Sequence, residues 1–341
     1  MIICRTPYRI SFFGGGTDYP AWYEKHGGCV LSTTIDKYCY LSCRFLPPFF
    51  EHKSRIVYSK VELVKSRDEI QHPAVREALK FMGIEEGVEI HHDGDLPART
   101  GTGSSSSFSV GLLHALYGLK EIMPTKKQLA LDAIHIERDV LKENVGSQDQ
   151  VAAAFGGLNK INFKPDGTFT VEPVILNGER LEDFQNHLML FFTGFSRTAS
   201  EIAKKKIENI EKKNEDLASM RQMVERGLGI LGGGNDLSDF GKLLHESWML
   251  KRSLAEGVTT PEIDQIYEAG LNAGAIGGKL IGAGGGGFIL FFAKPDNHKQ
   301  IREKLKKLIA VPFRLESNGS QIVFYRPNRR KTDRLLRERT F

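Results

Sequence analysis

A short run of small and hydroxyl-bearing residues, 101–107, has the composition of an anion-binding loop. Gly101 and Gly103 allow tight backbone curvature and close approach of a ligand, and four serines follow them. An apolar segment with helical spacing continues to Leu116, so one of the serines is placed to cap a helix. The N–H groups and the positive dipole end at such a helix N-terminus bind phosphate. The alternative from this stretch alone is a Gly/Ser-rich loop before an ordinary helix.

Two acidic residues lie in stretches of apolar or small residues, where a charged side chain is unusual. Glu137 lies on a helix predicted over 125–143, among mostly apolar neighbours. Asp149 lies in a stretch of small residues, where an acid either caps a helix or takes part in chemistry. The ordinary alternatives are a solvated helix charge for Glu137 and a helix cap for Asp149.

Three glycines at positions 14–16 follow an apolar strand predicted over 2–13. They make a turn or let a ligand approach the backbone, and the nearby charges of Arg9 and Asp18 favour a binding edge. A second glycine-rich run covers 277–287. It contains a G-x-G-x-x-G pattern, but a helix precedes it and a strand follows, which excludes a dinucleotide fingerprint. No G-x-x-x-x-G-K-[ST] sequence occurs, so a P-loop is excluded as well.

The elements that position these segments are expected to form two domains, because a chain of 341 residues is too long for one small domain and suits two moderate ones. A junction is predicted around 175–183, and we divide the chain into residues 1–175 and residues 176–341. Near the end, a strand pair is predicted over 311–325. The lysine-rich helix predicted over 199–222 is interpreted as a solvated, charged face.

The composition is that of a soluble globular protein, with 40% hydrophobic and 26% charged residues. The net charge of +5 suits anionic small molecules and is too diffuse to indicate nucleic-acid binding. No apolar run suits a signal peptide or a membrane span, so we expect a cytoplasmic protein without a membrane partner. The four cysteines form no C-x-x-C pair and are expected to be structural: Cys4, Cys29, Cys39 and Cys43.

Taken together, the three glycine-rich segments resemble the motifs of the GHMP small-molecule kinases, which include galactokinase, mevalonate kinase and homoserine kinase. Residues 5–19, RTPYRISFFGGGTDY, are similar to the N-terminal substrate motif of that family. Residues 97–107, PARTGTGSSSS, are similar to its nucleotide phosphate loop, and residues 279–288 are similar to its C-terminal glycine motif. The order and spacing of the three motifs agree over nearly the whole chain.

The resemblance implies a fold of the α/β (α+β) class, with two domains and an active site in the cleft between them. The N-terminal domain would be ribosomal protein S5 domain 2-like, and the C-terminal domain would be a ferredoxin-like α+β domain. The resemblance also implies phosphoryl transfer that depends on ATP and Mg²⁺, in which positioning and charge neutralisation matter more than covalent catalysis. The partner would be a small-molecule sugar or sugar phosphate, and the oligomeric state stays open.

The same resemblance implies roles for single residues. Asp149 matches the catalytic aspartate that orients the acceptor hydroxyl and takes its proton, and Arg9 matches the basic residue near it. Ser105 and Glu137 match the hydroxyl and the carboxylate that position Mg²⁺. The ATP phosphates would bind the backbone of the loop formed by Gly101, Thr102, Gly103, Ser104, Ser105, Ser106 and Ser107. The substrate would contact the first and last glycine segments at Gly15, Gly16, Thr17, Asp18, Gly284 and Gly285.

Within the superfamily, the chain most resembles the heptose 7-phosphate kinases, which phosphorylate the anomeric C1 hydroxyl of D-glycero-D-manno-heptose 7-phosphate. The shared features are the triple glycine, the stretch 146–150 (GSQDQ), and the Gly-Lys-Leu at 278–280. Three residues are candidates for binding the distal phosphate of such a substrate: Arg99, Lys251 and Lys279. Two alternatives stay open. One is another sugar 1-kinase, acting on fucose, a hexosamine or a uronic acid, and the other is a sensing protein that kept the fold and lost catalysis.

The chain departs from the family pattern in two of its motifs. The family's phosphate loop usually carries Leu where this chain has Thr102, and small residues such as Ala where it has Ser106 and Ser107. Galactokinase-like members carry an acid and a histidine where this chain has Gly15 and Gly16. Galactose is therefore disfavoured as the substrate, and a bulkier sugar gains room.

Overall fold

The computed structural model describes residues 1–98, 100–194, 199–234 and 236–327. Within these residues, nine strands form a mixed sheet and four form a second, antiparallel sheet. The first sheet follows the order β13-β1-β2-β5-β3-β4, while β6 and β12 also pair with β2 and β7 pairs with β6. Its strands are β1 (Ile2–Phe13), β2 (Gly28–Phe45), β3 (Ser54–Val57), β4 (Val61–Val64), β5 (Val88–Gly94), β6 (Asn159–Phe163), β7 (Phe169–Pro173), β12 (Leu315–Glu316) and β13 (Gln321–Tyr325).

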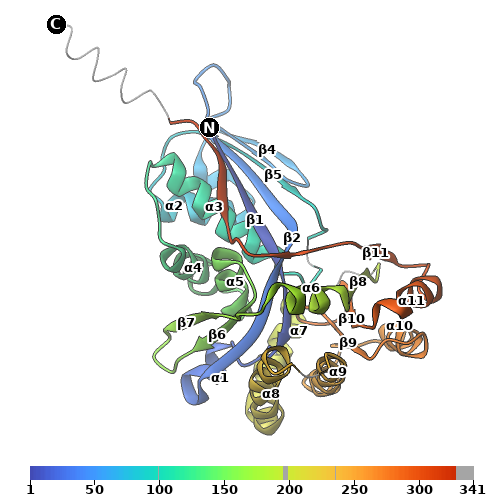
Figure 1. Cartoon of the computed structure of the whole chain (residues 1–341). Helices are drawn as coiled ribbons and strands as arrows, with labels where there is room; N and C mark the ends of the chain where they lie inside the picture. Colours follow the sequence, from blue (N-terminus) through green and yellow to red (C-terminus); the bar gives the residue numbers. More distant parts are fainter. Residues whose placement is uncertain (99, 195–198, 235, 328–341) are drawn as a thin grey trace, which may run out of the picture.

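Helix α3 packs along β1 and β2, and α2, α4 and α5 pack against α3. The apolar residues of α3 are buried on most sides of the helix, as expected for a helix inside a core. Figure 1 shows these helices on one side of the long strands. The helices of this part are α1 (Pro20–His26), α2 (Pro73–Phe81), α3 (Ser104–Leu119), α4 (Lys126–Ile134) and α5 (Gln148–Phe155).

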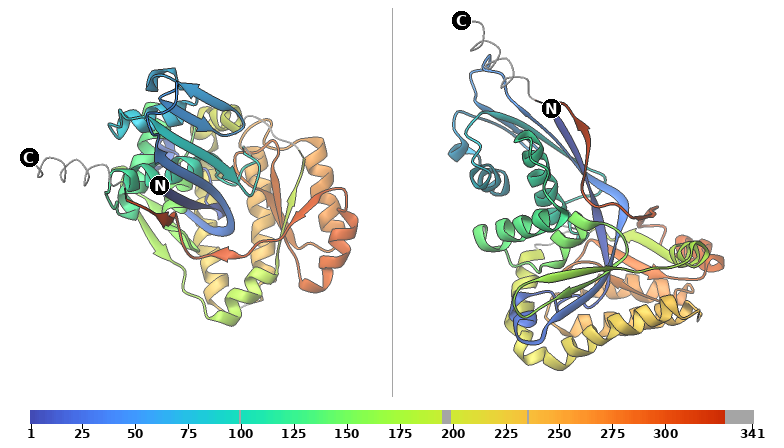
Figure 2. Two further views of the ribbon diagram at one scale, coloured as in Figure 1. Left: turned by 90° about the horizontal axis from the view of Figure 1, so that it is seen from above. Right: turned by 60° about the vertical axis from the view of Figure 1, so that its left-hand side comes forward.

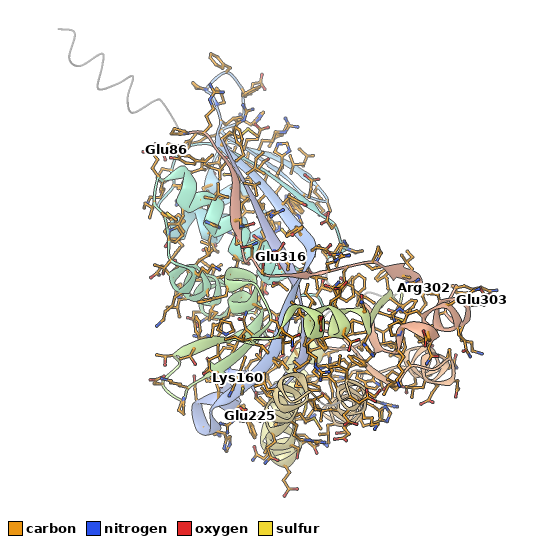
Figure 3. The ribbon with its side chains drawn as sticks, in the orientation of Figure 1. Glu86, Lys160, Glu225, Arg302, Glu303 and Glu316 are labelled. Carbon is orange, nitrogen blue, oxygen red and sulfur yellow. The ribbon has the colours of Figure 1, made fainter. Side chains whose placement is uncertain are left out.

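The second sheet has the order β11-β8-β10-β9, and helix α9 packs against β9 and β10. Figure 2 shows this sheet and its helices gathered beside the first sheet. The elements of this part are α6 (Gly178–Asn186), β8 (Leu188–Phe192), α7 (Ala199–Asn209), α8 (Asn214–Gly232), α9 (Ser238–Ser253), α10 (Pro261–Asn272), β9 (Gly277–Leu280), β10 (Phe288–Phe292), α11 (His298–Lys304) and β11 (Ile309–Val311). Helix α8 also contacts β1 and β2, and Lys160 on β6 forms an ion pair of 2.5 Å with Glu225 on α8 (Figure 3).

Strand β2 is a run of 18 residues rich in β-branched, aromatic and cysteine side chains, which favour a strand. Its pairing with β1 shifts register, because Pro7 pairs with Tyr38 whereas Tyr8 pairs with Ile35. The two residues between, 36 and 37, form a bulge next to Arg9. Bulges of this kind bend a strand and re-aim nearby side chains, often beside active sites.

The end of the described chain returns to the first sheet. The strand pair predicted over 311–325 is wrong as a pairing, because β12 pairs with β2 and β13 pairs with β1. Both strands thus satisfy their backbone groups against the long strands of the first sheet instead of against each other. Glu316 of β12 lies where this return crosses the middle of the molecule (Figure 3). Residues 315–325 therefore belong to the first sheet, although the predicted boundary at 175 groups them with the second domain.

The helix predicted over 125–143 is α-helical only to Ile134 and continues as a π-helix over His135–Val140. Such segments are rare and occur frequently at functional sites. The four cysteines are buried and free, as predicted. Within the described ranges, no helix is both long enough and apolar enough to cross a membrane.

Candidate active site

An ion pair between Arg9 and Asp149 lies at the centre of the candidate site. Strand β1 carries Arg9, and the first turn of α5 carries Asp149. The guanidinium binds the carboxylate with two hydrogen bonds, from Nε to Oδ1 at 2.7 Å and from Nη2 to Oδ2 at 2.8 Å. Arg9 is buried, whereas 25% of the Asp149 side chain is exposed. The pair therefore holds the carboxylate in one orientation and leaves it within reach of a ligand.

The Gly/Ser loop is attached to the same arginine. Arg9 Nη1 donates to the carbonyl oxygen of Gly101 at 2.6 Å, and the Arg9 backbone N–H donates to that of Thr102 at 3.0 Å. Gly101 and Gly103 have φ angles of +85° and +74°, which residues with side chains rarely adopt. A Cβ atom at Gly103 would lie 3.4 Å from Asp149 Oδ2. The loop thus brings the N-terminus of α3 next to the ion pair, where its N–H groups and dipole suit an anion.

The serines at the start of α3 have different environments. Ser105 is exposed. Ser106 is buried, and its hydroxyl donates to Glu137 Oε2 at 2.8 Å. Ser107 is buried, and its hydroxyl donates to the carbonyl oxygen of Pro7 at 2.9 Å. Ser106 and Ser107 stand where the similar family motif has smaller residues. Their hydroxyls therefore serve to satisfy buried hydrogen-bond acceptors.

Glu137 is fully buried on the π-helical segment, so the interpretation as a solvated helix charge is excluded. The side-chain amide of Gln150 also donates to Glu137 Oε2. Burial raises the pKa of the Glu137 carboxyl to about 7, although the nearby hydroxyls of Ser109 and Ser106 act in the opposite direction. The other oxygen, Oε1, has no hydrogen-bond partner in the described part of the chain. An oxygen of this kind is available to a further ligand.

The first glycine segment forms the loop between β1 and α1. The Asp18 carboxylate accepts the backbone N–H of Gly16 at 2.9 Å and that of Gln148 at 3.4 Å. The bond to Gln148, the residue before Asp149, attaches Asp18 to the start of α5. Burial raises the pKa of Asp18, and the negative charge of Asp149 adds to that effect. The Thr17 hydroxyl is buried and donates to the carbonyl oxygens of Gly14 and Cys29 at 2.8 Å and 3.0 Å. Thr17 thus builds the loop, and its hydroxyl does not face the site.

The last glycine run packs backbone to backbone against the Gly/Ser loop. A Cβ atom at Gly282 would lie 2.3 Å from Gly101 Cα, and the N–H of Phe288 donates to the carbonyl oxygen of Thr100 at 3.2 Å. The two predicted substrate residues in this run lie against Val258. The N–H of Gly285 donates to the Val258 carbonyl oxygen at 3.0 Å, and a Cβ at Gly284 would lie 2.7 Å from Val258 Cα.

Two family models match this chain. The one described as GHMP kinases N terminal domain matches residues 69–157, which contain the Gly/Ser loop, Glu137 and Asp149. The one described as GHMP kinases C terminal matches residues 213–310, which contain the last glycine run. The chain belongs to the GHMP kinase family. It is accordingly an ATP-dependent kinase that phosphorylates an alcohol group, and the predicted two-domain α/β architecture is confirmed.

Similar proteins cover nearly the full length of this GHMP kinase. The D-glycero-alpha-D-manno-heptose 7-phosphate kinase of Campylobacter jejuni is 28% identical, over 89% of this chain and 92% of that protein. The bifunctional fucokinase/GDP-fucose pyrophosphorylase of Arabidopsis thaliana is 22% identical, over 88% of this chain and 31% of that protein. A solved D-glycero-D-manno-heptose 1-phosphate kinase from Bacteroides thetaiotaomicron has a TM-score of 0.76 and 23% identity, over 94% of this chain and 98% of its own. That structural likeness supports the fold.

The donor atoms of this GHMP kinase fit Mg²⁺, which prefers oxygen ligands and usually binds one or two protein groups together with phosphates and water. Glu137 offers an unpartnered carboxylate oxygen, and Ser105 offers an exposed hydroxyl. The structure pairs Glu137 with Ser106 instead of Ser105, so the role of Ser105 stays a prediction. Within the described residues, no three His, Cys, Asp or Glu side chains gather into a metal site.

Sequence reasoning missed one basic residue of this kinase. Lys251 and Lys279, two of the candidates for a distal phosphate, are buried, and Lys206 is buried near them. The interpretation of the lysine-rich helix as a solvated face is therefore wrong at Lys206. The available signal was its helical spacing, because Ile202 precedes Lys206 by four residues and shares the buried face. The third candidate, Arg99, lies outside the described residues.

Proposed function

We propose that the protein is a sugar kinase that transfers the γ-phosphate of ATP to the anomeric C1 hydroxyl of D-glycero-D-manno-heptose 7-phosphate. The observation that carries the proposal is the two-point Arg9–Asp149 pair set against the N-terminus of α3. Phosphoryl transfer needs this combination of a fixed proton acceptor and a phosphate cradle. The choice of substrate is supported by the resemblance to heptose 7-phosphate kinases and by the likeness to the Campylobacter jejuni protein.

In this mechanism, Asp149 orients the C1 hydroxyl and accepts its proton. The sugar oxygen forms a bond to the γ-phosphorus as the bond between that phosphorus and the β,γ-bridging oxygen breaks, and ADP leaves. Arg9 holds the carboxylate in position with two hydrogen bonds and offsets the charge that develops beside it. The backbone of loop 101–107 holds the ATP phosphates. Ser105 and Glu137 would hold Mg²⁺, which would supply neutralisation of the phosphate charge.

The sugar lies between the first and last glycine segments. Asp18 contacts the residue before Asp149 and keeps further lone pairs for sugar hydroxyls, since each carboxylate oxygen can accept more than one hydrogen bond. Gly15 and Gly16 leave room where galactokinase-like members carry larger side chains. Gly284 and Gly285 support this wall through their packing against Val258.

Two alternative functions follow from the same site. Another sugar 1-kinase activity is supported by the likeness to the Arabidopsis thaliana fucokinase protein. A sensing protein without catalysis is disfavoured, because Arg9 and Asp149 both remain and form the pair that catalysis requires.

The decisive experiment is a panel of sugars and sugar phosphates tested by ATP-dependent ADP release. We expect turnover of the heptose 7-phosphate to exceed that of fucose, hexosamines and uronic acids. Asp149→Asn preserves the side-chain shape and removes the proton acceptor, so kcat should fall by about 10²–10⁴-fold. Asp68→Asn, at a side chain that is 86% exposed, is the matched control. Near wild-type turnover by Asp149→Asn would contradict the mechanism. Faster turnover of another sugar would show that the heptose 7-phosphate is not the preferred substrate.

A further inference from the structure

Three buried lysines meet at the junction of β1 with the last glycine run. Lys279 on β9 donates to the carbonyl oxygen of Phe12 at 2.6 Å, and Lys251 on α9 donates to that of Leu280 at 2.6 Å. Lys206 on α7 donates to that of Ala283. The exposed fractions of the three residues are 3%, 6% and 9%. Three separate elements therefore bring their ammonium groups into one region.

Within the described part of the chain, none of the three ammonium groups forms an ion pair with a carboxylate. Each carries three donors and uses one of them on a carbonyl oxygen. Buried like charges without a counter-charge are unfavourable. Burial, followed by the charges of Lys206 and Arg9, lowers the pKa of Lys279 to about 7. Burial also lowers the pKa of Lys251, with contributions from the other two lysines. The three ammonium groups therefore keep donors that no carboxylate of the described residues contacts directly.

The cluster lies against the first glycine segment, the loop between β1 and α1. Lys206 lines a small pocket together with Gly16 and Tyr19, two residues of that loop. Burial lowers the pKa of Lys206 to about 8, and the negative charge of Asp18 acts in the opposite direction. Phe12, the acceptor for Lys279, lies two residues before the triple glycine.

We propose that Lys206, Lys251 and Lys279 form a subsite for a phosphomonoester carried by the acceptor sugar, remote from the hydroxyl that reacts. The inference rests on the proposed function in one respect, namely that the acceptor is a sugar phosphate. Three ammonium groups with spare donors match the charge and the several oxygens of a phosphate dianion. Lys206 is the member of this subsite that was not among the candidates predicted from the sequence.

Two other roles for the cluster lead to different outcomes. A purely structural role, in which the lysines only brace backbone carbonyls, makes each of them important for stability. A role in binding the γ-phosphate of ATP makes them important for the KM of ATP. The subsite instead predicts an effect confined to phosphorylated acceptors.

The test compares Lys206→Met and Lys251→Met with wild-type protein, and uses Lys205→Met on the same helix as the matched control. The Lys205 side chain is 54% exposed. The acceptors are D-glycero-D-manno-heptose 7-phosphate and the same heptose without its phosphate. We expect kcat/KM for the phosphorylated sugar to fall by about 10- to 100-fold, the size expected for a lost charge-assisted hydrogen bond. The values for the unphosphorylated sugar and the KM for ATP should stay within about threefold.

Thermal unfolding separates the structural role. Methionine fills a similar volume without a buried unpaired charge, so Tm should stay constant or rise. Equal losses with both sugars, a rise in the KM for ATP alone, or a fall in Tm without loss of discrimination overturns the subsite.

A binding measurement tests the phosphate subsite independently of whether the protein phosphorylates the heptose. Inorganic phosphate is titrated calorimetrically into the protein saturated with a non-hydrolysable ATP analogue, which blocks the nucleotide phosphate positions. Wild-type protein and Lys205→Met should bind phosphate, and both buried-lysine variants should bind it at least about 10-fold more weakly. If no heptose is turned over but phosphate binding follows this pattern, the proposed function fails and the subsite stands. If phosphate does not bind to wild-type protein, the subsite fails whatever the sugar panel shows.

Discussion

The carboxyl group of Glu137 links two elements of the site, because it accepts hydrogen bonds from Ser106 at the start of α3 and from Gln150 in α5. Both donors contact the same oxygen, and the second oxygen stays unpartnered among the described residues. A carboxyl buried in this way resists ionisation until a cation or further donors reach it. In the absence of ligand, the Glu137 carboxyl therefore destabilises the folded state to an extent that depends on pH.

We predict that this effect appears as a pH-dependent difference between wild-type protein and Glu137→Gln. The folded pKa is about 7, above the ordinary value of 4.5. Between those values the folded state keeps the proton and the unfolded state has lost it, so the free energy of unfolding of wild-type protein falls as pH rises. The variant lacks this contribution. From pH 5 to pH 8 its stability relative to wild-type protein should rise by about 2–3 kcal/mol.

Urea unfolding without nucleotide or Mg²⁺ measures this difference, and comparison of the two proteins cancels the contributions of other groups. Kinase activity should fall in the variant although its stability relative to wild-type protein rises with pH. Unfolding free energies that run parallel across this pH range would contradict the assignment.

At the scale of elements, the site depends on two glycine-rich segments that approach each other too closely for side chains. The loop before α3 and the turn between β9 and β10 meet at Gly101 and Gly282. Gly282 also has a φ of +77°. The contact holds the Gly/Ser loop against the second sheet, so its geometry controls both the position of the loop and the packing of the two parts.

We predict that Gly282→Ala lowers the free energy of unfolding by about 2–4 kcal/mol, because the Cβ meets backbone atoms and the backbone conformation is strained. The value of kcat/KM should fall as well, since the loop before α3 must move. Gly229→Ala is the control. Gly229 lies within α8, and a Cβ there meets no atom within 4 Å, so that variant should gain about 0.5–1 kcal/mol. Urea unfolding and ADP release measure both; unchanged activity in Gly282→Ala would count against the contact.

At the scale of the whole molecule, the two sheets share a continuous core. Phe12 at the end of β1 packs edge to face with Phe184 of α6 and Phe240 of α9, at centroid distances of 5.5 Å for both pairs. The chain then returns through β12 and β13 to the first sheet, where β13 lies beside β1 (Figure 2). The hydroxyl of Ser320, just before β13, lies 2.9 Å from His114 Nδ1 of α3. These contacts join the end of the described chain to the sheet that carries Arg9.

We predict that the amides of β13 exchange with solvent only when β1 and β2 open. Native-state hydrogen exchange should therefore give β13 the same opening free energy as β1, within about 1 kcal/mol. The amides of α10 serve as a comparison outside the first sheet, because that helix packs on β9 and α11. Exchange of β13 at the lower free energy of a frayed edge, independent of β1, would contradict its assignment to the first sheet.

Local features of the site were predictable from sequence because they depend on local chemistry. Gly101 and Gly103 indicate a loop with unusual φ angles, and the apolar spacing that follows indicates the helix whose N-terminus can hold phosphate. The motif order indicated the family, and the two-domain architecture followed from it. Helix and strand periods also predicted most elements, since they report which face of each element is buried.

Tertiary structure alone decided which side chains meet, because contacts between residues far apart in sequence leave no local pattern. Arg9 and Asp149 are separated by 140 positions and form two hydrogen bonds. The neighbouring serines differ because rotation along α3 turns Ser106 toward Glu137 and leaves Ser105 exposed. Lys206 is buried because α7 packs its apolar face inward, and β13 joins β1 because an open sheet edge accepts a strand from anywhere in the chain.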